Sequence, residues 1–274
     1  MEPITSKKNN DRDVSAIDAE YVRNSFPERK FDSNKGDNGR VMIVAGSKGM
    51  SGAAVMAGKA ALRSGAGLVY LSVPKEIQNP INIYVPEIIT MADASVEQMR
   101  SIKLSAVGVG PGIGADKKNI VGRLTRSDLK CPLIIDADGL NAISNNPAVL
   151  LKRKCAVIIT PHPGEMARLL KTTVAKIQED RVNIALKAAK EWNVIVVLKG
   201  AFTVIADPSG RHFINTTGNP GLATAGTGDV LTGMICGLAG QGIEPFSAAA
   251  CGAFIHGMCG DAVALNKGQR GMIA

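Results

Sequence analysis

Residues 219–242, "NPGLATAGTGDVLTGMICGLAGQG", contain seven glycines and a single acid, Asp229, which stands between a glycine-rich turn and an apolar run. Each glycine in the interior of a helix costs about 1 kcal/mol relative to alanine, so a buried helix has little use for so many. A loop whose backbone must approach a ligand closely does use glycine. The stretch therefore predicts a ligand-binding turn that leads into a helix over about 228–240.

The turn "AGTGD", residues 225–229, places the backbone N–H groups of Gly226, Thr227 and Gly228 at the start of this helix. Such a turn binds anions, helped by the helix dipole. A carboxylate in the same turn would repel a phosphate unless it had a chemical role. The role that fits is to accept a proton from a hydroxyl group while the turn stabilises a moving phosphoryl group. Asp229 is therefore predicted to be a general base, and a plain helix cap is the alternative.

The rest of the chain predicts the scaffold that carries this turn. Short apolar runs alternate with helical segments and predict strands over 41–45, 67–73, 87–90, 104–110, 132–137, 155–160 and 194–200. Strands that are apolar throughout indicate a parallel sheet covered on both faces. "FTVIADPSGRHFIN", residues 202–215, interrupts the alternation and predicts a β-hairpin. We expect one three-layer α/β/α domain over 16–274, after a disordered tail of residues 1–15.

The helical pattern between the strands is clearest at 51–65 and at 173–191, and a last helix is expected over about 244–265. A short helix is expected within 16–26. In sheets of this kind, ligands bind at the carboxyl ends of the strands. Candidate site residues are therefore sought in the turns that follow the predicted strands.

The composition limits the class of protein. Apolar residues make up 45% and charged residues 20%, as in ordinary soluble domains. We expect no membrane-spanning segment and no signal peptide, hence a cytoplasmic protein. Five cysteines without a CxxC pair and only three histidines predict neither a disulfide framework nor a zinc site. The net charge of +8 with 4% aromatic residues favours an anionic small molecule over nucleic acid as the partner.

Two other glycine-rich turns fit known phosphate motifs poorly. Residues 46–59 lack the spacing of a Walker loop, because five residues separate Gly52 from Gly58 and Ala60 stands where a hydroxyl is needed. Residues 110–115 fit GxGxxA, but Pro111 has no N–H, and Asp136 is only a loose candidate for the acid of a dinucleotide fold. Both turns are interpreted as close-packed connections, the second also as part of a ligand site.

Polar residues follow several predicted strands. Asp138 comes after the strand at 132–137 and could cap the next helix or act in the site. His162 lies between two prolines after the strand at 155–160, and Glu165 and Arg168 follow it with the spacing of a surface ion pair on a helix. Lys199 ends the strand at 194–200 and could either reach a phosphate or be solvated.

Taken together, these motifs resemble the ADP/ATP-dependent NAD(P)H-hydrate dehydratases of the ribokinase-like superfamily, whose members carry a GxGD turn with the aspartate as base. The resemblance covers nearly everything after residue 25. It rests on residues 25–69, "GVGPGIG", "IDADGLN", "TPHPGEMARL", "VLKGAFTVI" and the stretch quoted first. It implies phosphorylation of the C6 hydroxyl of the S-epimer of hydrated NADH or NADPH by ADP or ATP. Phosphate then leaves and the cofactor is regenerated.

The resemblance also implies roles for individual residues. Asp229 is the base, and Gly226, Thr227 and Gly228 form the anion hole. The nucleotide site is lined by Lys199, Gly200, Ala201, Phe202, Thr203, Asn215, Thr216 and Gly228. The hydrate site is lined by Ala53, Gly112, His162, Glu165, Arg168 and Asp229. Magnesium is expected to arrive on the nucleotide phosphates, with no protein ligand assigned.

The resemblance further suggests a homo-oligomer, possibly a tetramer, with small-molecule partners and neither nucleic acid nor membrane. The chain departs from the family pattern at Ala225, where a second glycine is usual, and it stops at Ala274, where the family continues with a helix. We expect no epimerase activity, because the epimerase domain often fused to this one is not in the sequence.

Three rival functions stay open on the sequence alone. The nearest is a kinase of the same fold that acts on a vitamin-precursor alcohol, such as a thiazole or hydroxymethylpyrimidine, and releases a stable phosphate ester. A non-catalytic nucleotide sensor would tolerate the loss of Asp229. A nicotinamide dehydrogenase is disfavoured by the poor fingerprint at 110–115.

Overall fold

The computed structural model describes residues 15–114 and 119–274. Residues 1–14 of the predicted tail and Ala115 of the GxGxxA match lie outside the described residues. Ser15, the last residue of the predicted tail, instead belongs to a short strand, β1 (Ser15–Ala16), where it pairs with Phe213. The ordered part of the chain therefore begins at least one residue earlier than predicted.

The described residues form one sheet of ten strands in the order β1-β10-β9-β8-β7-β6-β5-β2-β3-β4. Strands β2 to β8 run parallel to one another, whereas β9 is antiparallel to both β8 and β10 and forms the predicted hairpin with β10. After β1, the strand bounds are β2 Arg40–Val44, β3 Leu68–Val73, β4 Ile89–Ala92, β5 Ala106–Val109, β6 Leu133–Ile135, β7 Val157–Ile159, β8 Ile195–Leu198, β9 Val204–Ala206 and β10 His212–Ile214.

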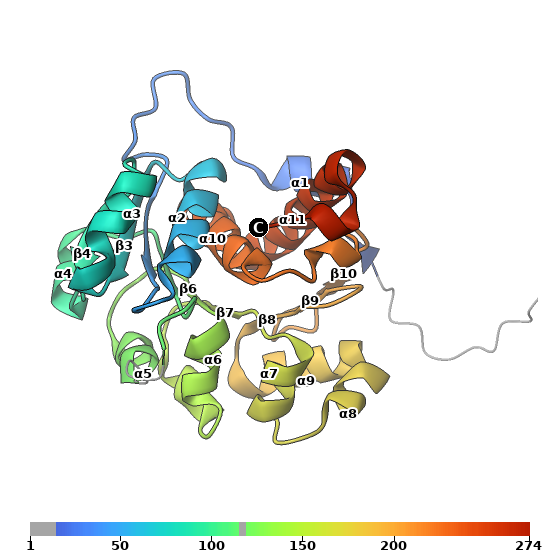
Figure 1. Cartoon of the computed structure of the whole chain (residues 1–274). Helices are drawn as coiled ribbons and strands as arrows, with labels where there is room; N and C mark the ends of the chain where they lie inside the picture. The colour runs from blue at the N-terminus through green and yellow to red at the C-terminus, as the bar shows by residue number, and fades with distance from the viewer. Residues whose placement is uncertain (1–14, 115–118) are drawn as a thin grey trace, which may run out of the picture.

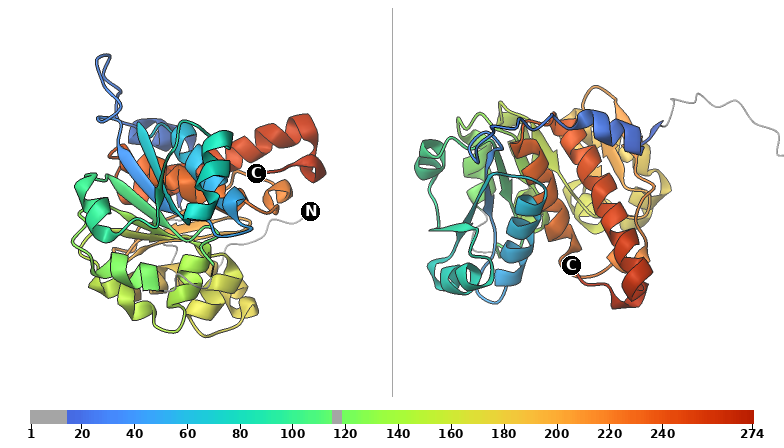
Figure 2. Two further views of the ribbon diagram at one scale, coloured as in Figure 1. Left: turned by 60° about the vertical axis from the view of Figure 1, so that its left-hand side comes forward. Right: turned by 90° about the horizontal axis from the view of Figure 1, so that it is seen from above.

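Helices cover both faces of the sheet, as Figures 1 and 2 show. One face packs against α1 (Ala19–Ser25), α2 (Ser51–Arg63), α3 (Gln78–Tyr84), α10 (Thr227–Gly240) and α11 (Pro245–Lys267). The other packs against α4 (Val96–Ser101), α5 (Asn119–Arg126), α6 (Ala137–Ile143), α7 (Pro163–Leu169), α8 (Val174–Glu179) and α9 (Arg181–Trp192). Two apolar cores result, one on each side of the sheet. The predicted three-layer α/β/α fold with a mostly parallel sheet is confirmed.

The central strands show why this arrangement is stable. Every residue of β5, β6, β7 and β8 is buried, because each strand is apolar on both faces. Alternate side chains enter the two cores, as Ile134 and Ile135 do from neighbouring positions of β6. The sheet is thereby held between two helical layers, and the turns at its carboxyl edge are held in fixed places.

The single helix predicted over 173–191 is wrong, since the structure has two helices there. The side chain of Asp180 accepts a hydrogen bond from the N–H of Asn183 and so starts α9 as an N-cap. The apolar spacing continues across the break, which is why periodicity alone did not reveal it. The new helix start places Arg181 at the beginning of α9, next to the end of β8.

The glycines within helix α10 have a different role from the ligand-binding one that was predicted for them. A Cβ on Gly233 would lie 1.9 Å from the carbonyl oxygen of Ala57 in α2, and one on Gly240 would lie 2.2 Å from Val41 in β2. Both glycines are buried, and they allow α10 to touch the backbone of α2 at Gly233 and the side chain of Val41 at Gly240. Part of the glycine content therefore serves helix packing and not ligand approach.

Helix α11 has 23 residues and contains an 18-residue window with a mean hydropathy of 1.4, so it is long and apolar enough to cross a membrane by length and composition. Half of that window is buried in the fold, where Phe246 and Ala249 lie in the core. A core helix explains this composition, and the hydropathy by itself supports no membrane role.

Candidate active site

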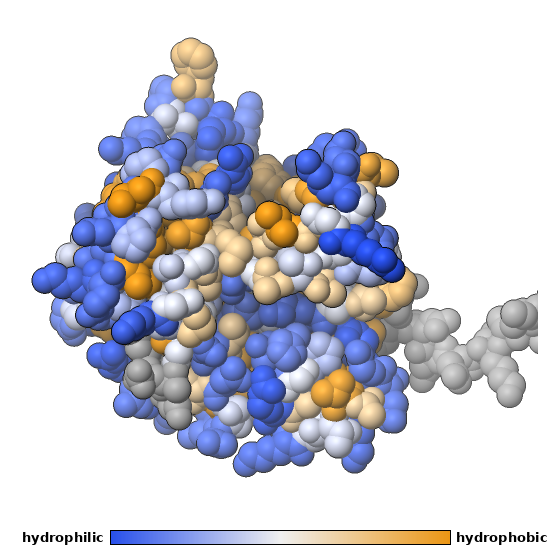
Figure 3. All heavy atoms as spheres, viewed as in Figure 1, coloured by the Kyte–Doolittle hydropathy of each residue, from blue (hydrophilic) through white to orange (hydrophobic). Residues whose placement is uncertain are grey.

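The candidate site lies where three neighbouring parallel strands end. Asp136 directly follows β6, His162 follows β7 after two residues, and Lys199 directly follows β8. The first turn of α10 points at the same edge, because Gly228 approaches the side chains of both Lys199 and Asp136. In the space-filling view, white to orange residues occupy the middle of the face shown, and hydrophilic residues lie below them (Figure 3).

Lys199 is the centre of a charged cluster. Its Nζ lies 2.6 Å from Oδ1 of Asp136 and 3.9 Å from Oε2 of Glu165. Its side chain is 18% exposed. Burial acts to lower the pKa of Lys199, but the two carboxylates outweigh burial and raise it, so the ammonium stays charged. The structure thus directs the side chain of Lys199 into the site and not toward solvent.

Asp229 faces this cluster from α10. Burial is the largest influence on its carboxyl group, and together with the negative charges of Asp136 and Asp138 it raises the pKa of Asp229 to about 6, against the opposing effect of Lys199. A carboxyl group with such a pKa is mostly ionised at neutral pH and still binds a proton more readily than an ordinary aspartate. That is the property required of a general base.

The turn at the start of α10 is open toward this base. Gly226, in the left-handed region with φ +93°, is the N-cap, and no described side chain caps the helix. The hydroxyl of Thr227 is held by the carbonyl oxygens of Leu222 at 2.8 Å and Thr224 at 2.9 Å. A Cβ on Gly228 would lie 3.4 Å from Nζ of Lys199. The N–H of Thr227 donates to the carbonyl oxygen of Thr224 at 3.4 Å, and Gly228 lies beside the ammonium of Lys199, an arrangement that suits an anion.

His162 and Glu165 lie beside the cluster and hold each other. The backbone N–H of His162 donates to Oε2 of Glu165 at 2.8 Å, and Nδ1 of His162 accepts from the N–H of Gly164 at 3.0 Å. Burial, then Lys199 and Arg168, lower the pKa of His162, so its ring is neutral. Arg168 lies at the side, where it donates to Asn141 at 3.1 Å and forms no ion pair with Glu165 among the described contacts.

The residues assigned to the hydrate site from α2 and the β5 turn also meet. A Cβ on Gly112 would lie 2.9 Å from Cβ of Ala53, so the two positions are adjacent. Two residues further along the same turn, the N–H of Gly114 donates to Oδ2 of Asp138 at 3.0 Å. Asp138 in turn influences the pKa of Asp229. Ala53 and Gly112 are thereby linked through the Gly114 turn to the charged cluster.

The segment assigned to the nucleotide, residues 199–203, is more open. Gly200 has φ +140°, and Phe202 has φ +56° and is 66% exposed. Arg181 holds the segment from α9, since its Nη2 donates to the carbonyl oxygens of Leu198 at 2.8 Å and Lys199 at 3.3 Å. Residues 200–202 are therefore exposed, while the chain beside them is held to α9 through backbone carbonyls.

Asn215 and Thr216 differ from each other. The amide of Asn215 is buried and bonded within the protein, donating to Ala253 at 3.2 Å and accepting from the hydroxyl of Thr217 at 2.9 Å. Thr216 is exposed. The side chain of Asn215 is thus hydrogen-bonded within the protein at the end of the hairpin. The predicted nucleotide-binding roles of Asn215 and Thr216 stay predictions.

Four side chains of this region were not predicted from the sequence to lie in the site. Asp136 was considered only for a dinucleotide fold, and Thr232, Arg181 and His256 were not considered. Burial lowers the pKa of His256 to about 4, and its ring hydrogen-bonds the backbone of Thr227. Asp136 could have been found from its place at a strand end. The other three reach the site only through tertiary packing.

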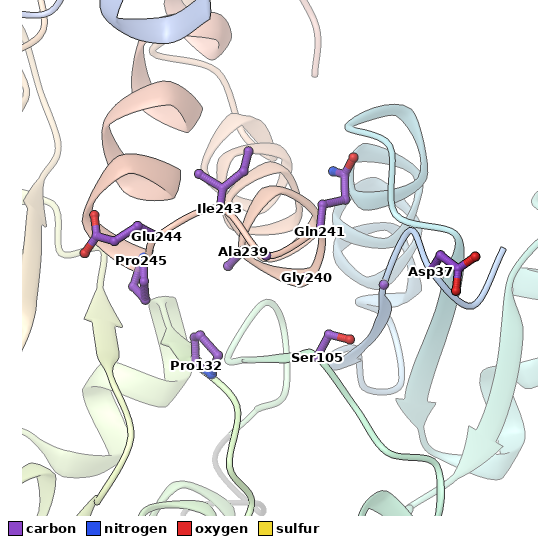
Figure 4. Close-up of a pocket in the computed structure, with 11 residues that line it drawn as sticks. Asp37, Ser105, Pro132, Ala239, Gly240, Gln241, Ile243, Glu244 and Pro245 are labelled. Carbon is purple, nitrogen blue, oxygen red and sulfur yellow. The ribbon is translucent and has the colours of Figure 1, made fainter. Parts of the chain in front are cut away.

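A pocket of about 380 Å³ lies at the opposite edge of the sheet (Figure 4). Its lining residues precede β2, β5 and β6 or belong to the α10–α11 connection. Gln241 donates to backbone carbonyls of Ser64 and Gly237, and Glu244 caps α11. Their labelled side chains point in different directions in Figure 4. Since these polar groups are engaged within the fold and do not converge, the chemistry is assigned to the carboxyl edge.

Comparison with known proteins agrees with the family resemblance found in the sequence. A model of the NAD(P)H-hydrate dehydratase family matches residues 41–274. The bifunctional NAD(P)H-hydrate repair enzyme Nnr of Moorella thermoacetica is 45% identical over 273 residues, which cover 94% of this chain and 51% of that protein. The ADP-dependent (S)-NAD(P)H-hydrate dehydratase of Neisseria meningitidis is 40% identical over 247 residues, covering 89% of this chain and 83% of that protein.

Among solved structures, the ADP/ATP-dependent NAD(P)H-hydrate dehydratase from Bacillus subtilis, co-crystallised with ATP and Mg²⁺, superposes with a TM-score of 0.83 at 32% identity. The match covers 96% of this chain and 94% of that one. The chain spans about half the length of the bifunctional relatives it matches.

Proposed function

Because the chain belongs to the NAD(P)H-hydrate dehydratase family, we propose that it uses ADP or ATP to dehydrate the S-epimer of hydrated NADH or NADPH. The observation that carries the proposal is the pairing of Asp229, whose pKa is raised to about 6, with an open helix start and the ammonium of Lys199. A base, an anion site and a fixed positive charge at one place suit phosphoryl transfer from a nucleotide to a hydroxyl group.

The reaction divides into two steps. Asp229 takes the proton of the C6 hydroxyl as its oxygen attacks the terminal phosphorus of the nucleotide. The new O–P bond forms as the bond to the leaving AMP or ADP breaks. Hydroxide is a poor leaving group and phosphate a good one, so C6–O cleavage then expels phosphate. Loss of a proton from the neighbouring ring carbon restores the double bond and the reduced cofactor.

Each part of the site has a role in these two reaction steps. The N–H groups of the α10 turn and Lys199 stabilise the charge on the transferred phosphoryl group. His162, Glu165, Ala53 and Gly112 line the side from which the hydrate approaches. The open segment 200–203 and Thr216 lie on the nucleotide side. Arg181 keeps that segment in place through the backbone carbonyls.

Magnesium fits this site as an ion carried by the nucleotide. Within residues 15–114 and 119–274, no three His, Cys, Asp or Glu side chains are arranged to hold a metal ion. Mg²⁺ commonly keeps several waters and binds through substrate phosphates, so no protein ligand is assigned to it. When bound, the ion would neutralise phosphate charge during transfer.

The test is a single incubation. The protein is mixed with the S-epimer of hydrated NADH, magnesium and either ADP or ATP, and both absorbance at the reduced-nicotinamide band and free phosphate are followed. We expect both signals to rise together, and only with nucleotide. Turnover without nucleotide would contradict the proposal. A stable phosphate ester from a vitamin-precursor alcohol would favour the rival kinase.

We further propose that the protein is a cytoplasmic homo-oligomer. The five cysteines are all free, which suits a reducing compartment. The exposed apolar residues Met258, Val263 and Leu265 on the second half of α11 would be covered by another subunit. Light scattering coupled to size-exclusion chromatography tests this assembly, and a monomer at micromolar concentration would contradict it.

A further inference from the structure

We propose that Asp136 is a positioning residue that fixes the ammonium of Lys199 beside the first turn of α10, where it faces both the transferred phosphoryl group and Asp229. This assignment rests on the proposed function for the identity of the reaction. It goes beyond the residues assigned to either binding site, because Asp136 acts through Lys199 and touches neither substrate.

Both carboxylate oxygens of Asp136 are engaged. Oδ1 accepts from Nζ of Lys199 at 2.6 Å, and Oδ2 accepts from the hydroxyl of Thr232 at 2.7 Å. The residue is 1% exposed. Lys199 follows β8 and Thr232 lies in α10, so this one side chain joins the end of a strand to the helix that carries Asp229.

The local backbone is bent to make this contact. Asp136 stands at the N-cap of α6, a place where aspartate ordinarily accepts from the helix backbone, yet its side chain makes no such bond. The next residue, Ala137, has φ +47°, which is uncommon for a residue with a side chain. Such strain concentrates at functional sites, where it is retained because it aims a group.

A purely structural ion pair is the competing explanation. Buried pairs contribute little net stability compared with well-packed apolar residues, so stability alone does not account for one at this place. The surroundings favour a functional role. A Cβ on Gly228 would lie 3.4 Å from Nζ of Lys199 and 3.7 Å from Oδ2 of Asp136, so the pair adjoins the anion turn directly.

The two charges of the pair act on Asp229 in opposite directions. The groups that influence Asp229 are Asp136 and Asp138 near α6 and Lys199 after β8. After burial, Asp136 raises the pKa of Asp229, whereas Lys199 lowers it. Neutralising Asp136 should therefore move the acid limb of the pH profile downward, and neutralising Lys199 should move it upward. Shifts in these opposite directions would show that both charges of the pair act on Asp229 in the folded protein.

The experiment compares Asp136→Asn with the parent across pH 5–9. Phosphoryl transfer is measured as AMP formed from ADP in the presence of hydrated NADH, and ADP affinity is measured by calorimetry. We expect kcat to fall about 10²-fold, as for a displaced reacting geometry. The acid limb should move down by about one pH unit. The ADP dissociation constant should stay within a few-fold, because Lys199 keeps its charge.

Asp207→Asn is the matched control. Asp207 is also a buried carboxylate in an ion pair, with Arg211, but it lies in the hairpin turn after β9. Its loss should leave the acid limb in place. Equal losses of kcat in the two variants, with both acid limbs unmoved, would overturn the assignment. If Asp136→Asn does not fold, the test rests on Lys199→Met alone. The assignment is then overturned if the acid limb of the pH profile of Lys199→Met does not move to higher pH.

Failure of the proposed function would look different. The parent protein would then form no NADH from its hydrate, whatever the variants do. The positioning role would still be measurable as AMP formation with any alcohol that the parent phosphorylates.

Discussion

The side chains of Asp136, Glu165 and Lys199 near Asp229 are bonded to one another and largely buried, whereas residues 200–202, which follow Lys199, are exposed. The first region fixes charges at short distances. Beside the second region, Arg181 donates a hydrogen bond to the carbonyl oxygen of Leu198, and the outer surface of that region is exposed. Under the proposed function, this difference predicts a site that is specific about where a proton and a phosphoryl group move and less demanding about the rest of the nucleotide.

The largest effect is expected for Asp229→Asn, which breaks the charged region at its base. Asparagine has nearly the same shape and suits a helix start, but it cannot take the hydroxyl proton as a carboxylate does. Turnover should fall by about 10²–10⁴-fold, while nucleotide affinity holds or improves slightly. Steady-state kinetics and calorimetry check both values on a variant whose circular dichroism matches the parent. Turnover within a few-fold of the parent would leave Asp229 as a helix cap.

The pH dependence is the next largest effect. Burial and neighbouring carboxylates raise the pKa of Asp229 to about 6, and the base must be deprotonated to act. Activity is therefore present above pH 6 and lost as the pH falls through that value, approaching about tenfold per pH unit. The profile of kcat/KM from pH 4.5 to 8 measures this, with circular dichroism at each pH as the control. A flat profile down to pH 5 would contradict the assigned base.

Arg181→Met should affect the open region alone. The variant loses the hydrogen bonds to the carbonyl oxygens of Leu198 and Lys199, and bonds from charged groups contribute about 1.5–3 kcal/mol. The KM for nucleotide should rise about tenfold with kcat changed much less. Arg211→Met, which breaks an ion pair in the hairpin, is the matched control. A fall in kcat without a change in KM would show that the two regions are not separate.

The smallest effect is expected for Ala225→Gly. Ala225 is exposed, one residue before the left-handed Gly226. Removing its methyl group can only ease the approach of backbone to a phosphate, so activity should stay the same or rise slightly. Turnover measured at saturating ADP and ATP checks this. A large loss of turnover in a folded Ala225→Gly variant would mean that the methyl group of Ala225 supports the turn.

The fold could be predicted closely because its signals are local. Apolar runs such as residues 194–200 and 155–160 indicate buried parallel strands by themselves, and the DPSG turn indicates the hairpin. The break between α8 and α9 was not predicted, because it depends on one side chain. Asp180 caps a new helix at a place where the apolar spacing still favours one continuous helix. Strand β1 was missed because two residues carry no pattern.

The site was predictable only in part. Asp229 and its turn could be identified, since glycines and a lone acid at a helix start have few other uses. The partners of Lys199 could not, because Asp136 and Glu165 lie far from it in the sequence and meet it only once three strands are side by side. Glycines of α10 were misread for the same reason, since their neighbours are in α2 and β2.

The backbone contact between Gly233 of α10 and Ala57 of α2 has a consequence for chemical probes of this protein. Helix α2 begins near Ala53, on the proposed hydrate side, and α10 begins at the proposed phosphate turn. Where the two helices touch through their main chains, they cannot come closer. The gap between the two proposed binding regions should therefore have a set width. An inhibitor that joins a nicotinamide mimic to a phosphate mimic should show a sharp optimum in the length of its linker.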